Sequence, residues 1–340
     1  MSSAGDLFAP VLKALAADPS TEFGQPGATV EVLRQLDGPF SSVQRVRIQT
    51  AQRTVHAYTK VLKPRKPGPD ELAMLDRMLQ REYNATAALY RALPPDPEIS
   101  AVRPIAILPE HRALATEEVP GRPFADLLAD ASVDAAALVA IARRIGTWAR
   151  MYQQVVPATG HVVLAERRTY LDARLRLLEG RVLSAAERAA CLALFDTLRE
   201  EIGSPEVPAA AIHADLGPMN IIVDANGRIA VLDFTMAKTG TIHHDLSHVY
   251  FHLELLGAHN RRRRALVPSL ERAMLDGYRP GMTAAEPLFR LMLLQHAVCH
   301  VALLAERRFP MVDAAYRWFL RRRWQLCERI SAVDPEVQVA

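Results

Sequence analysis

The sequence predicts an α+β fold of two lobes, a small N-terminal lobe of antiparallel strands with a helix and a larger, mainly helical C-terminal lobe. Apolar and polar residues alternate in the first third of the chain, which is typical of half-buried strands. From Ala125 to Ile202 the chain is rich in Ala, Leu and Arg, which favours helices. With 340 residues, 50% of them hydrophobic, the chain is also long enough for two compact parts.

The strands of the small lobe are expected on both sides of a turn at Asp37-Gly38-Pro39. The flanking stretches, TVEVLRQL and FSSVQRVRIQT, alternate in polarity and predict a β-hairpin. RTVHAYTKVL (residues 53–62) predicts a third strand, whose successive side chains point to opposite faces. One face then carries Val55, Ala57, Thr59 and Val61, and the other carries His56, Tyr58, Lys60 and Leu62.

Helical patterns and chain breakers suggest the remaining elements of the small lobe and the bounds of the domains. A short amphipathic helix is expected at residues 7–17, and a longer helix over Asp70–Leu93, which Pro94-Pro95 end. RPIAILPEHRALATEEV predicts two more strands. We therefore expect an N-terminal helical extension at 1–25, the small lobe at 26–118 and the helical lobe at 119–335.

Composition restricts the class of partner and the compartment. The chain has 41 Lys and Arg against 38 Asp and Glu, and this balance does not indicate nucleic acid as a partner. Three widely spaced cysteines, Cys191, Cys299 and Cys327, predict no disulfide framework, and a cytoplasmic location fits best. The N-terminal residues lack the pattern of a signal peptide. The longest apolar stretch, Leu291–Ala305, is too short to span a bilayer comfortably and predicts a buried helix.

HADLGPMNIIV (213–223) and VLDF (231–234) place two acids and an amide around a predicted hairpin. Asn226-Gly227 predicts a two-residue turn, because both positions tolerate positive φ. Folding the hairpin back brings Asp215 and Asn220 close to Asp233. Carboxylate and amide oxygens are suitable ligands for Mg²⁺. A carboxylate free of metal suits a base that accepts a proton from a hydroxyl.

H-x-D-x-x-x-x-N, followed by an apolar residue and D-F, resembles the catalytic signature of the protein kinase-like superfamily. The form here is similar to that of the aminoglycoside phosphotransferase and choline kinase branch, and Asp245-Leu246-Ser247 matches a later element of that branch. The resemblance extends from about Val30 to Tyr250. It implies a bilobal protein kinase-like fold that binds ATP and Mg²⁺ in a cleft and transfers the γ-phosphoryl group to a hydroxyl of a small molecule.

The resemblance also implies roles for residues of these motifs. Asp215 resembles the catalytic aspartate that orients the acceptor hydroxyl and takes its proton. Asn220 and Asp233 resemble the Mg²⁺ ligands. His213 resembles a structural residue of the catalytic loop, and Asp245 resembles the acid that holds this loop through hydrogen bonds to its backbone.

In the small lobe, Lys60 resembles the strand lysine that contacts the α- and β-phosphates, and Glu82 resembles the helix glutamate that pairs with it. Lys63 is the alternative lysine, but its odd offset from Lys60 points it to the opposite face of the strand. Glu71 is the alternative glutamate, but it lies in the first turn of the predicted helix, where an acid complements the helix dipole.

Backbone groups from Glu117 to Val119 are expected to bind the adenine edge, since this stretch resembles the linker between lobes. No G-x-G-x-x-G covers the phosphates, and this absence is common in the small-molecule branch. Backbone N–H groups of the turn or the hydroxyls of Ser41 and Ser42 are the candidates for the phosphate contacts.

Clusters of histidine and arginine allow further hypotheses. The spacing of His244, His248 and His252, and of His296 and His300, suits a zinc site, whereas the alternative is partly buried helix histidines that line the acceptor pocket. The runs Arg261–Arg264 and Arg321–Arg323 predict solvated faces, with contact to an anionic surface, such as acidic lipid or a phosphorylated acceptor, as the alternative.

The expected acceptor is an antibiotic, sugar, amino alcohol or similar metabolite. A polycationic aminoglycoside is not favoured, because the acids of the helical lobe form no dense cluster; they are Glu254, Glu271, Asp276, Glu286 and Glu306. The alternatives are a membrane-associated kinase of a glycolipid or cell-envelope sugar and a non-catalytic nucleotide-binding module. The choice between ATP and GTP and the oligomeric state stay open.

Overall fold

The computed structural model describes residues 4–17, 29–38, 40–64 and 68–306. It divides the chain into two compact units, the first formed by residues 1–126 with Met219–Ala237, and the second by Leu127–Pro218 with residues 238–340. The hairpin at 219–237 thus belongs to the first unit, although it follows several helices of the second in sequence. The boundary expected between residues 118 and 119 stays a prediction. Arg321–Arg323 lie outside the described residues.

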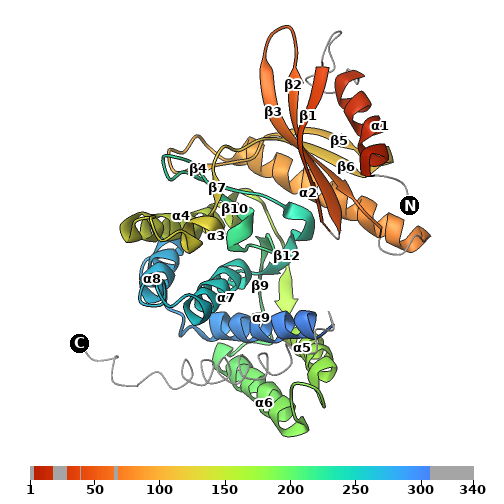
Figure 1. The fold of residues 1–340 in the computed structure, drawn as a ribbon. Coiled ribbons are helices and arrows are strands. Elements are labelled where there is room, and N and C mark those ends of the chain that lie inside the picture. The colour runs from red at the N-terminus through yellow and green to blue at the C-terminus, as the bar shows by residue number, and fades with distance from the viewer. Residues whose placement is uncertain (1–3, 18–28, 39, 65–67, 307–340) are drawn as a thin grey trace. The chain divides into compact units, whose positions relative to one another are not determined.

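A five-stranded sheet forms the centre of the first unit (Figure 1). Its strands lie in the order β1-β2-β3-β6-β5 and pair antiparallel throughout. Their bounds are β1 (Thr29–Asp37), β2 (Ser41–Gln49), β3 (Thr54–Leu62), β5 (Pro104–Leu108) and β6 (Ala113–Glu117). The first hairpin, the third strand and the two later strands are therefore confirmed.

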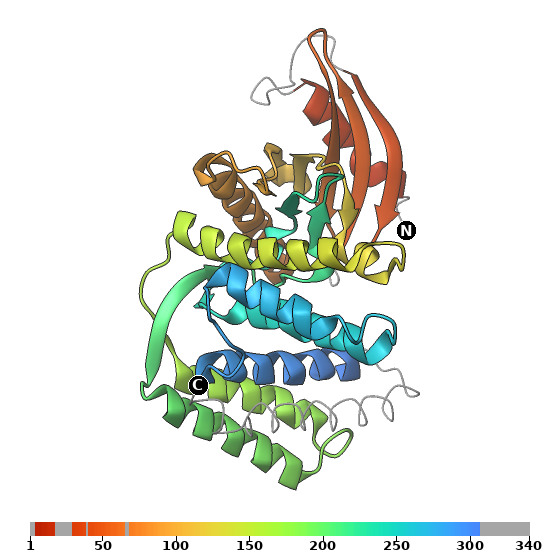
Figure 2. The same cartoon turned by 90° about the vertical axis from the view of Figure 1, so that its left-hand side faces the viewer.

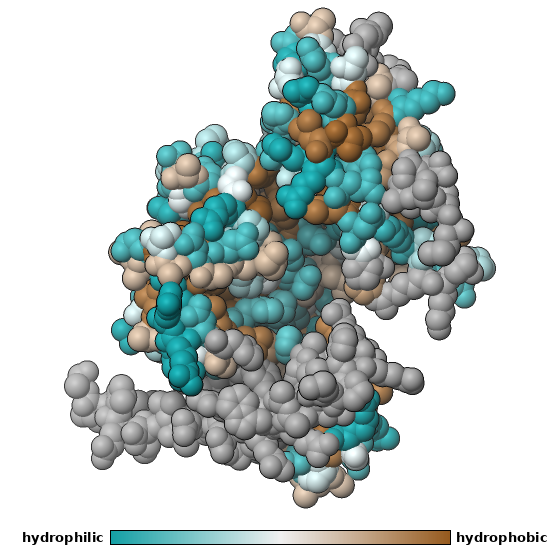
Figure 3. Space-filling model, viewed as in Figure 1, coloured by the Kyte–Doolittle hydropathy of each residue, from teal (hydrophilic) through white to brown (hydrophobic). Residues whose placement is uncertain are grey.

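Two helices cover the two faces of this sheet. Helix α1 (Ala4–Ala17) packs Phe8, Val11 and Leu15 into a core with the buried residues of β2 and β3. Helix α2 (Pro69–Ala92) packs Leu75 and Leu79 against Leu62 and Leu114 on the other face. The alternation predicted for β3 accounts for this division, since Val55, Ala57, Thr59 and Val61 are buried. Apolar side chains also gather on the surface over the strands (Figure 3), where Val32, Leu33 and Leu36 of β1 are exposed.

A smaller sheet of the first unit contains the hairpin that precedes Asp233. Its order is β4 (Ile99–Ser100), β11 (Ile229–Val231), β10 (Ile221–Val223) and β7 (Arg122–Pro123). The predicted two-residue turn at Asn226-Gly227 is wrong. Residues 224 and 228 are joined by a backbone hydrogen bond of 2.9 Å, and of the two turn residues Gly227 alone has positive φ. The Asp224 carboxylate accepts the N–H groups of Asn226 and Arg228 and so stabilises a longer loop.

The second unit is mainly helical, with one three-stranded sheet in the order β12 (Lys238–Thr241), β9 (Glu206–Ile212), β8 (His161–Val163). Helix α9 contacts α5, α6 and α7 (Figure 2, where α9 is dark blue). The buried helix predicted at Leu291–Ala305 lies within α9. Among the described residues, the helices of this unit are α3 (Phe124–Ala129), which begins in the first unit, α4 (Ala135–Val155), α5 (Leu164–Leu178), α6 (Ala185–Ile202), α7 (His244–His259), α8 (Val267–Tyr278) and α9 (Pro287–Glu306). Short 3₁₀ helices lie at Pro109–His111, Pro218–Asn220 and Phe234–Met236.

Helices α4 and α8 meet backbone to backbone at two glycines. A Cβ atom on Gly277 would lie 2.0 Å from the Arg143 carbonyl oxygen, and one on Gly146 would lie 1.9 Å from that of Met274. Both distances are far inside van der Waals contact, so a side chain at either position would push the helices apart.

Within the described part of the chain, no helix combines the length and the apolar character that crossing a membrane would require.

Candidate functional site

Lys60 of β3 and Glu82 of α2 form an ion pair in the first unit. The Lys60 Nζ lies 3.1 and 3.0 Å from the two carboxylate oxygens of Glu82. Lys60 lies on the face of the sheet that α2 covers, and Glu82 is a buried residue of that helix. The two residues that the sequence suggested as partners are thus brought together, although a loop and half a helix separate them.

The same ammonium group contacts Asp233 and Thr235. The Lys60 Nζ lies 2.7 Å from Asp233 Oδ1 and 2.8 Å from Thr235 Oγ1. Thr235 Oγ1 in turn lies 2.6 Å from Glu82 Oε2 and also contacts Asp233 Oδ1. We call these four residues, Lys60, Glu82, Asp233 and Thr235, the lysine cluster.

The two carboxylates of the lysine cluster differ in their exposure to solvent. The Glu82 side chain is 6% exposed, whereas that of Asp233 is 41% exposed. Burial opposes the charge on Lys60, but the charges of Glu82 and Asp233 outweigh it and raise the pKa of Lys60. Lys60 is therefore a permanent cation, and Asp233 is the carboxylate that is open to a ligand.

The alternative lysine and glutamate have other surroundings. Lys63 lies 3.0 Å from Asp37, at the end of the first hairpin. Hydrogen bonds from Ser42, Lys63 and Gln35 hold the pKa of Asp37 at about 2. Glu71 lies in the first turn of α2, as expected for an acid that complements the helix dipole. Neither residue is part of the lysine cluster.

The two serines near the tip of the first hairpin differ in burial. The Ser42 hydroxyl is fully buried and donates to Asp37. Ser41 is partly exposed, and its carbonyl accepts the Gly38 N–H at 2.9 Å. Of the two predicted phosphate contacts, Ser41 has the more accessible hydroxyl.

The backbone of the smaller sheet places Asn220 near Asp233. The Leu232 N–H donates to the Asn220 carbonyl oxygen, with the two atoms 2.8 Å apart. Asp233 itself adopts a left-handed conformation (φ 65°, ψ 65°), which costs a residue with a side chain roughly 1 kcal/mol or more. A half-exposed carboxylate and a neighbouring amide are oxygen donors of the kind Mg²⁺ prefers, so these residues fit that ion.

The catalytic-loop motif in the second unit is fixed by Asp245 at the start of α7. Its fully buried carboxylate accepts the backbone N–H groups of His213 at 2.7 Å and of Ala214 at 2.9 Å. Ala214 has φ 64°, so these bonds hold a strained turn. Burial raises the pKa of Asp245, but hydrogen bonding and the charges of His244 and His213 outweigh burial and lower it overall.

His213 is a buried residue of the catalytic loop, whereas Asp215 is exposed to solvent. The His213 ring is buried, lies edge-on against Trp148 and accepts the Asp215 N–H at Nδ1, 3.3 Å away. The Asp215 side chain is exposed. The loop thus presents one carboxylate to solvent on a backbone that two buried side chains hold.

The stretch from Glu117 to Val119 leaves β6 beside a pocket on the sheet. The N–H groups of Glu117 and Glu118 donate to the carbonyl oxygens of Arg103 and His56, at 2.9 and 2.8 Å. These two N–H groups are therefore occupied within the first unit. Val119, the next residue, is partly exposed.

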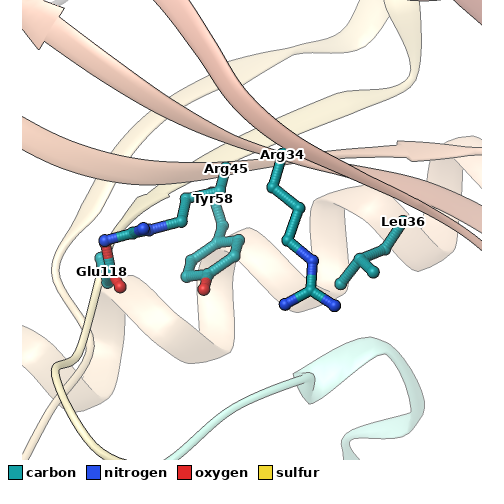
Figure 4. A pocket seen from close by; sticks show the side chains of 5 residues that line it. All are labelled: Arg34, Leu36, Arg45, Tyr58 and Glu118. Atoms are coloured by element: carbon teal, nitrogen blue, oxygen red, sulfur yellow. The ribbon is translucent and has the colours of Figure 1, made fainter.

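The pocket has a volume of about 230 Å³ and lies on the same face of β3 as Lys60. In Figure 4 the Tyr58 ring lies between Arg45, which reaches to Glu118 at 2.8 Å, and the guanidinium of Arg34. Burial, and next the charge of Glu118, raise the pKa of Tyr58, so the phenol stays neutral. The pocket is lined by Arg34, Leu36, Arg45, Tyr58 and Glu118.

The sequence reasoning missed Tyr58 and Thr235 as site residues. The sequence pattern could have identified Tyr58, because it lies on the same face of the predicted strand as Lys60. Thr235 follows Asp233 by two residues, but its contacts depend on the left-handed turn at Asp233, which the sequence pattern did not indicate.

The histidine and arginine clusters have structural partners. His248 and His252 lie 3.3 Å apart between their Nε2 atoms, and His296 bonds to the His244 carbonyl. Among the residues the structure describes, no three His, Cys, Asp or Glu side chains are placed to hold a metal ion.

Two of the four arginines in the run at 261–264 are engaged by the fold. Arg263 is buried and donates to the carbonyl oxygens of Leu128, Asp130 and Val133. Arg264 donates to the Gly257 carbonyl at 2.9 Å. Arg261, Arg262 and Arg264 are exposed, and of these three Arg264 is held by a backbone carbonyl.

Comparison with solved structures confirms the kinase-like fold. A choline/ethanolamine kinase family protein from Mesorhizobium loti superposes with a TM-score of 0.55 at 15% identity, covering 97% of this chain and 96% of its own. Macrolide 2′-phosphotransferase MphH from Brachybacterium faecium superposes with a TM-score of 0.55 at 19% identity, covering 93% of this chain and 96% of its own. ADP-bound aminoglycoside phosphotransferase APH(2″)-Ib superposes with a TM-score of 0.56 at 13% identity, covering 92% of this chain and 96% of its own.

No curated protein matches the sequence. The sequence model described as "Phosphotransferase enzyme family" matches residues 33–288, well over half of the chain and both compact units. The predicted branch and the predicted class of enzyme are therefore confirmed. This chain belongs to the phosphotransferase enzyme family and is a small-molecule phosphotransferase with a protein kinase-like fold.

Proposed function

We propose that this enzyme transfers the γ-phosphoryl group of ATP to a hydroxyl of a small, non-polycationic molecule. The observation that carries the proposal is the lysine cluster, in which Lys60 is held between Glu82 and the half-exposed Asp233. Phosphoryl transfer requires little covalent chemistry from a protein beyond position and charge. A fixed cation beside a carboxylate open to a metal supplies both.

Lys60 is proposed to contact the α- and β-phosphates, and Glu82 to hold its ammonium group in place. Asp233 and Asn220 are proposed to hold Mg²⁺, which when bound neutralises charge on the phosphate oxygens. The permanent charge of Lys60 supports this role, because the nearby carboxylates raise its pKa. Ser41 is the more accessible of the two serines for a phosphate contact.

Asp215 is proposed to accept the proton of the acceptor hydroxyl. As that oxygen bonds to the γ-phosphorus, the bond from this phosphorus to the bridging oxygen of ADP breaks, and ADP leaves with the bond electrons. The exposed carboxylate of Asp215 supports this role. The buried bonds of Asp245 to the loop keep the base in one place.

The adenine base is proposed to bind in the pocket beside Tyr58. An aromatic ring gives a flat partner for a purine, with offset stacking as the favoured arrangement. Lys60 and Tyr58 are two residues apart on one face of β3, which supports base and phosphates of one nucleotide lying along this strand. Backbone groups at Glu117–Val119 are proposed to contact the base edge.

The acceptor is proposed to be a sugar, an amino alcohol or a macrolide-like alcohol rather than a polycation. Of the acids in the helical unit, Glu271 is buried, Glu286 pairs with Arg279, and Asp276 lies 3.6 Å from Arg143. One of these carboxylates is buried, and the other two already have an arginine partner. They are therefore poor partners for the several ammonium groups of an aminoglycoside.

The proposed function is tested by ADP formation from Mg²⁺·ATP over a panel of sugars, amino alcohols, nucleosides and antibiotics. The proposal expects turnover that depends on one acceptor class and is lost in Asp215→Ala, Asp233→Ala and Lys60→Met, with each variant's fold checked by circular dichroism. Full turnover by Asp215→Ala on the true acceptor would show the assignment to be wrong.

A further inference from the structure

Thr235 has contacts to every other member of the lysine cluster. Its hydroxyl lies 2.8 Å from Lys60 Nζ and 2.6 Å from Glu82 Oε2, and it contacts Asp233 Oδ1. The residue is 8% exposed. A buried hydroxyl with three charged neighbours makes stronger hydrogen bonds than one that bonds to a backbone carbonyl, because hydrogen bonds to charges are about twice as strong.

The hydrogens of the cluster can be assigned from its geometry. Lys60 has three N–H hydrogens, and four oxygen contacts lie within 3.1 Å of its Nζ. The Thr235 hydroxyl accepts one of these hydrogens and has a single hydrogen of its own. That hydrogen goes either to Glu82 or to Asp233. Thr235 is therefore the one neutral group that can redistribute a hydrogen bond between the two carboxylates.

The backbone conformation of Asp233 is stable only when neighbouring groups constrain it. The residue is in the left-handed region, and its side chain makes no capping hydrogen bond to the 3₁₀ turn that follows it. A non-glycine residue stays in this conformation when its surroundings fix it. The contacts of its carboxylate with Lys60 and Thr235 supply two of these constraints.

We propose that Thr235 is a positioning residue that sets how tightly Asp233 binds a divalent cation together with the nucleotide. When Asp233 directs its oxygens to a cation, the Thr235 hydrogen turns to Glu82 and keeps that carboxylate on Lys60. When no cation is bound, the hydrogen returns to Asp233. This inference rests on the proposed function, since it assumes that Asp233 is a metal ligand.

Thr86 is a matched control on the same helix as Glu82. It is 4% exposed, and its hydroxyl donates to the Glu82 backbone carbonyl at 2.8 Å rather than to the carboxylate. Thr235→Val and Thr86→Val each replace a buried threonine by a residue of nearly equal shape that lacks the hydroxyl. Thr235→Ser keeps the hydroxyl and removes a methyl group.

The experiment measures Mn²⁺ binding to the full-length protein with ADP present, from the electron paramagnetic resonance signal of free Mn²⁺. No turnover is involved. We expect Thr235→Val to weaken Mn²⁺ binding about tenfold, as for the loss of a hydrogen bond to a charged group. Thr235→Ser and Thr86→Val are expected to stay within about twofold of the parent protein. If Thr235→Val does not fold, Thr235→Ala takes its place, with thermal unfolding as the check.

The outcomes separate the inference from the proposed function. Parent protein that binds no Mn²⁺·ADP contradicts the proposed function itself. Parent protein that binds, together with Thr235→Val binding equally well, overturns the role of Thr235 alone. Equal losses in Thr235→Val and Thr86→Val also overturn it, because a general packing defect then explains both. Weaker binding in Thr235→Val, restored by Thr235→Ser, supports it.

Discussion

The carboxylate of Asp245 accepts the backbone N–H of His213, with Oδ2 and N 2.7 Å apart, from the start of a helix 32 positions along the chain. Asp245→Asn turns one acceptor into a donor that faces a backbone N–H. We expect the free energy of unfolding to fall by about 2–4 kcal/mol, as for a buried pair that loses a partner. Urea unfolding measures it. Asp276→Asn, at a partly exposed pair with Arg143, is the control and should change stability by less than about 1 kcal/mol.

Arg263 and Arg262 are neighbours in a run of four arginines, but their expected contributions to stability differ. Arg263→Met leaves the carbonyl oxygens of Leu128, Asp130 and Val133 without their donor, so we expect a loss of about 2–3 kcal/mol. Arg262→Met removes an exposed side chain and should change stability by less than about 0.5 kcal/mol. Thermal unfolding distinguishes the two. Equal effects would contradict the structural role assigned to Arg263.

Tyr58 is expected to contribute to nucleotide affinity through its ring rather than its hydroxyl. Tyr58→Ala should weaken binding of ATP about tenfold, which corresponds to the loss of one aromatic stacking contact. Tyr58→Phe keeps the ring and should bind within about twofold of the parent protein. Isothermal titration calorimetry measures both. Unchanged affinity in Tyr58→Ala would place the base away from this pocket.

His243 makes the protein sensitive to acid. Burial is the main cause that lowers the pKa of His243 to about 4, whereas an unfolded histidine has a pKa near 6.5. Between these values the unfolded chain binds more protons, so stability falls as the pH falls from about 6.5 to about 4, by roughly 3 kcal/mol in total. Unfolding at a series of pH values measures the slope. His243→Phe should flatten it, and a slope that is unchanged in this variant would assign it to other groups.

The sequence alone predicted the elements of the small lobe well, because each has a local signal. Alternation in RTVHAYTKVL indicates β3 and puts Lys60 and Tyr58 on one face, and the breakers at Pro94-Pro95 end the long helix close to Ala92. The ion pair of Lys60 with Glu82 followed from these two elements. Such features need no knowledge of distant contacts.

Other features depend on tertiary contacts that leave no local pattern. Nothing in a run of four arginines distinguishes Arg263, whose burial depends on the loop at residues 128–133. The turn at Asn226-Gly227 has a common two-residue signature, yet the side chain of Asp224 selects a longer loop. Thr235 likewise gains its neighbours from a backbone turn rather than from its sequence context.

The two glycines where α4 and α8 touch have a consequence for large-scale mutagenesis. A survey that scores every substitution by growth or yield should find positions 146 and 277 as intolerant as Asp215, because any side chain there meets a carbonyl oxygen at about 2 Å. Intolerance at these glycines would report the spacing of two helices. A readout that measures protein abundance separately from turnover would distinguish these glycines from Asp215, since only the glycine variants should lose abundance in the cell.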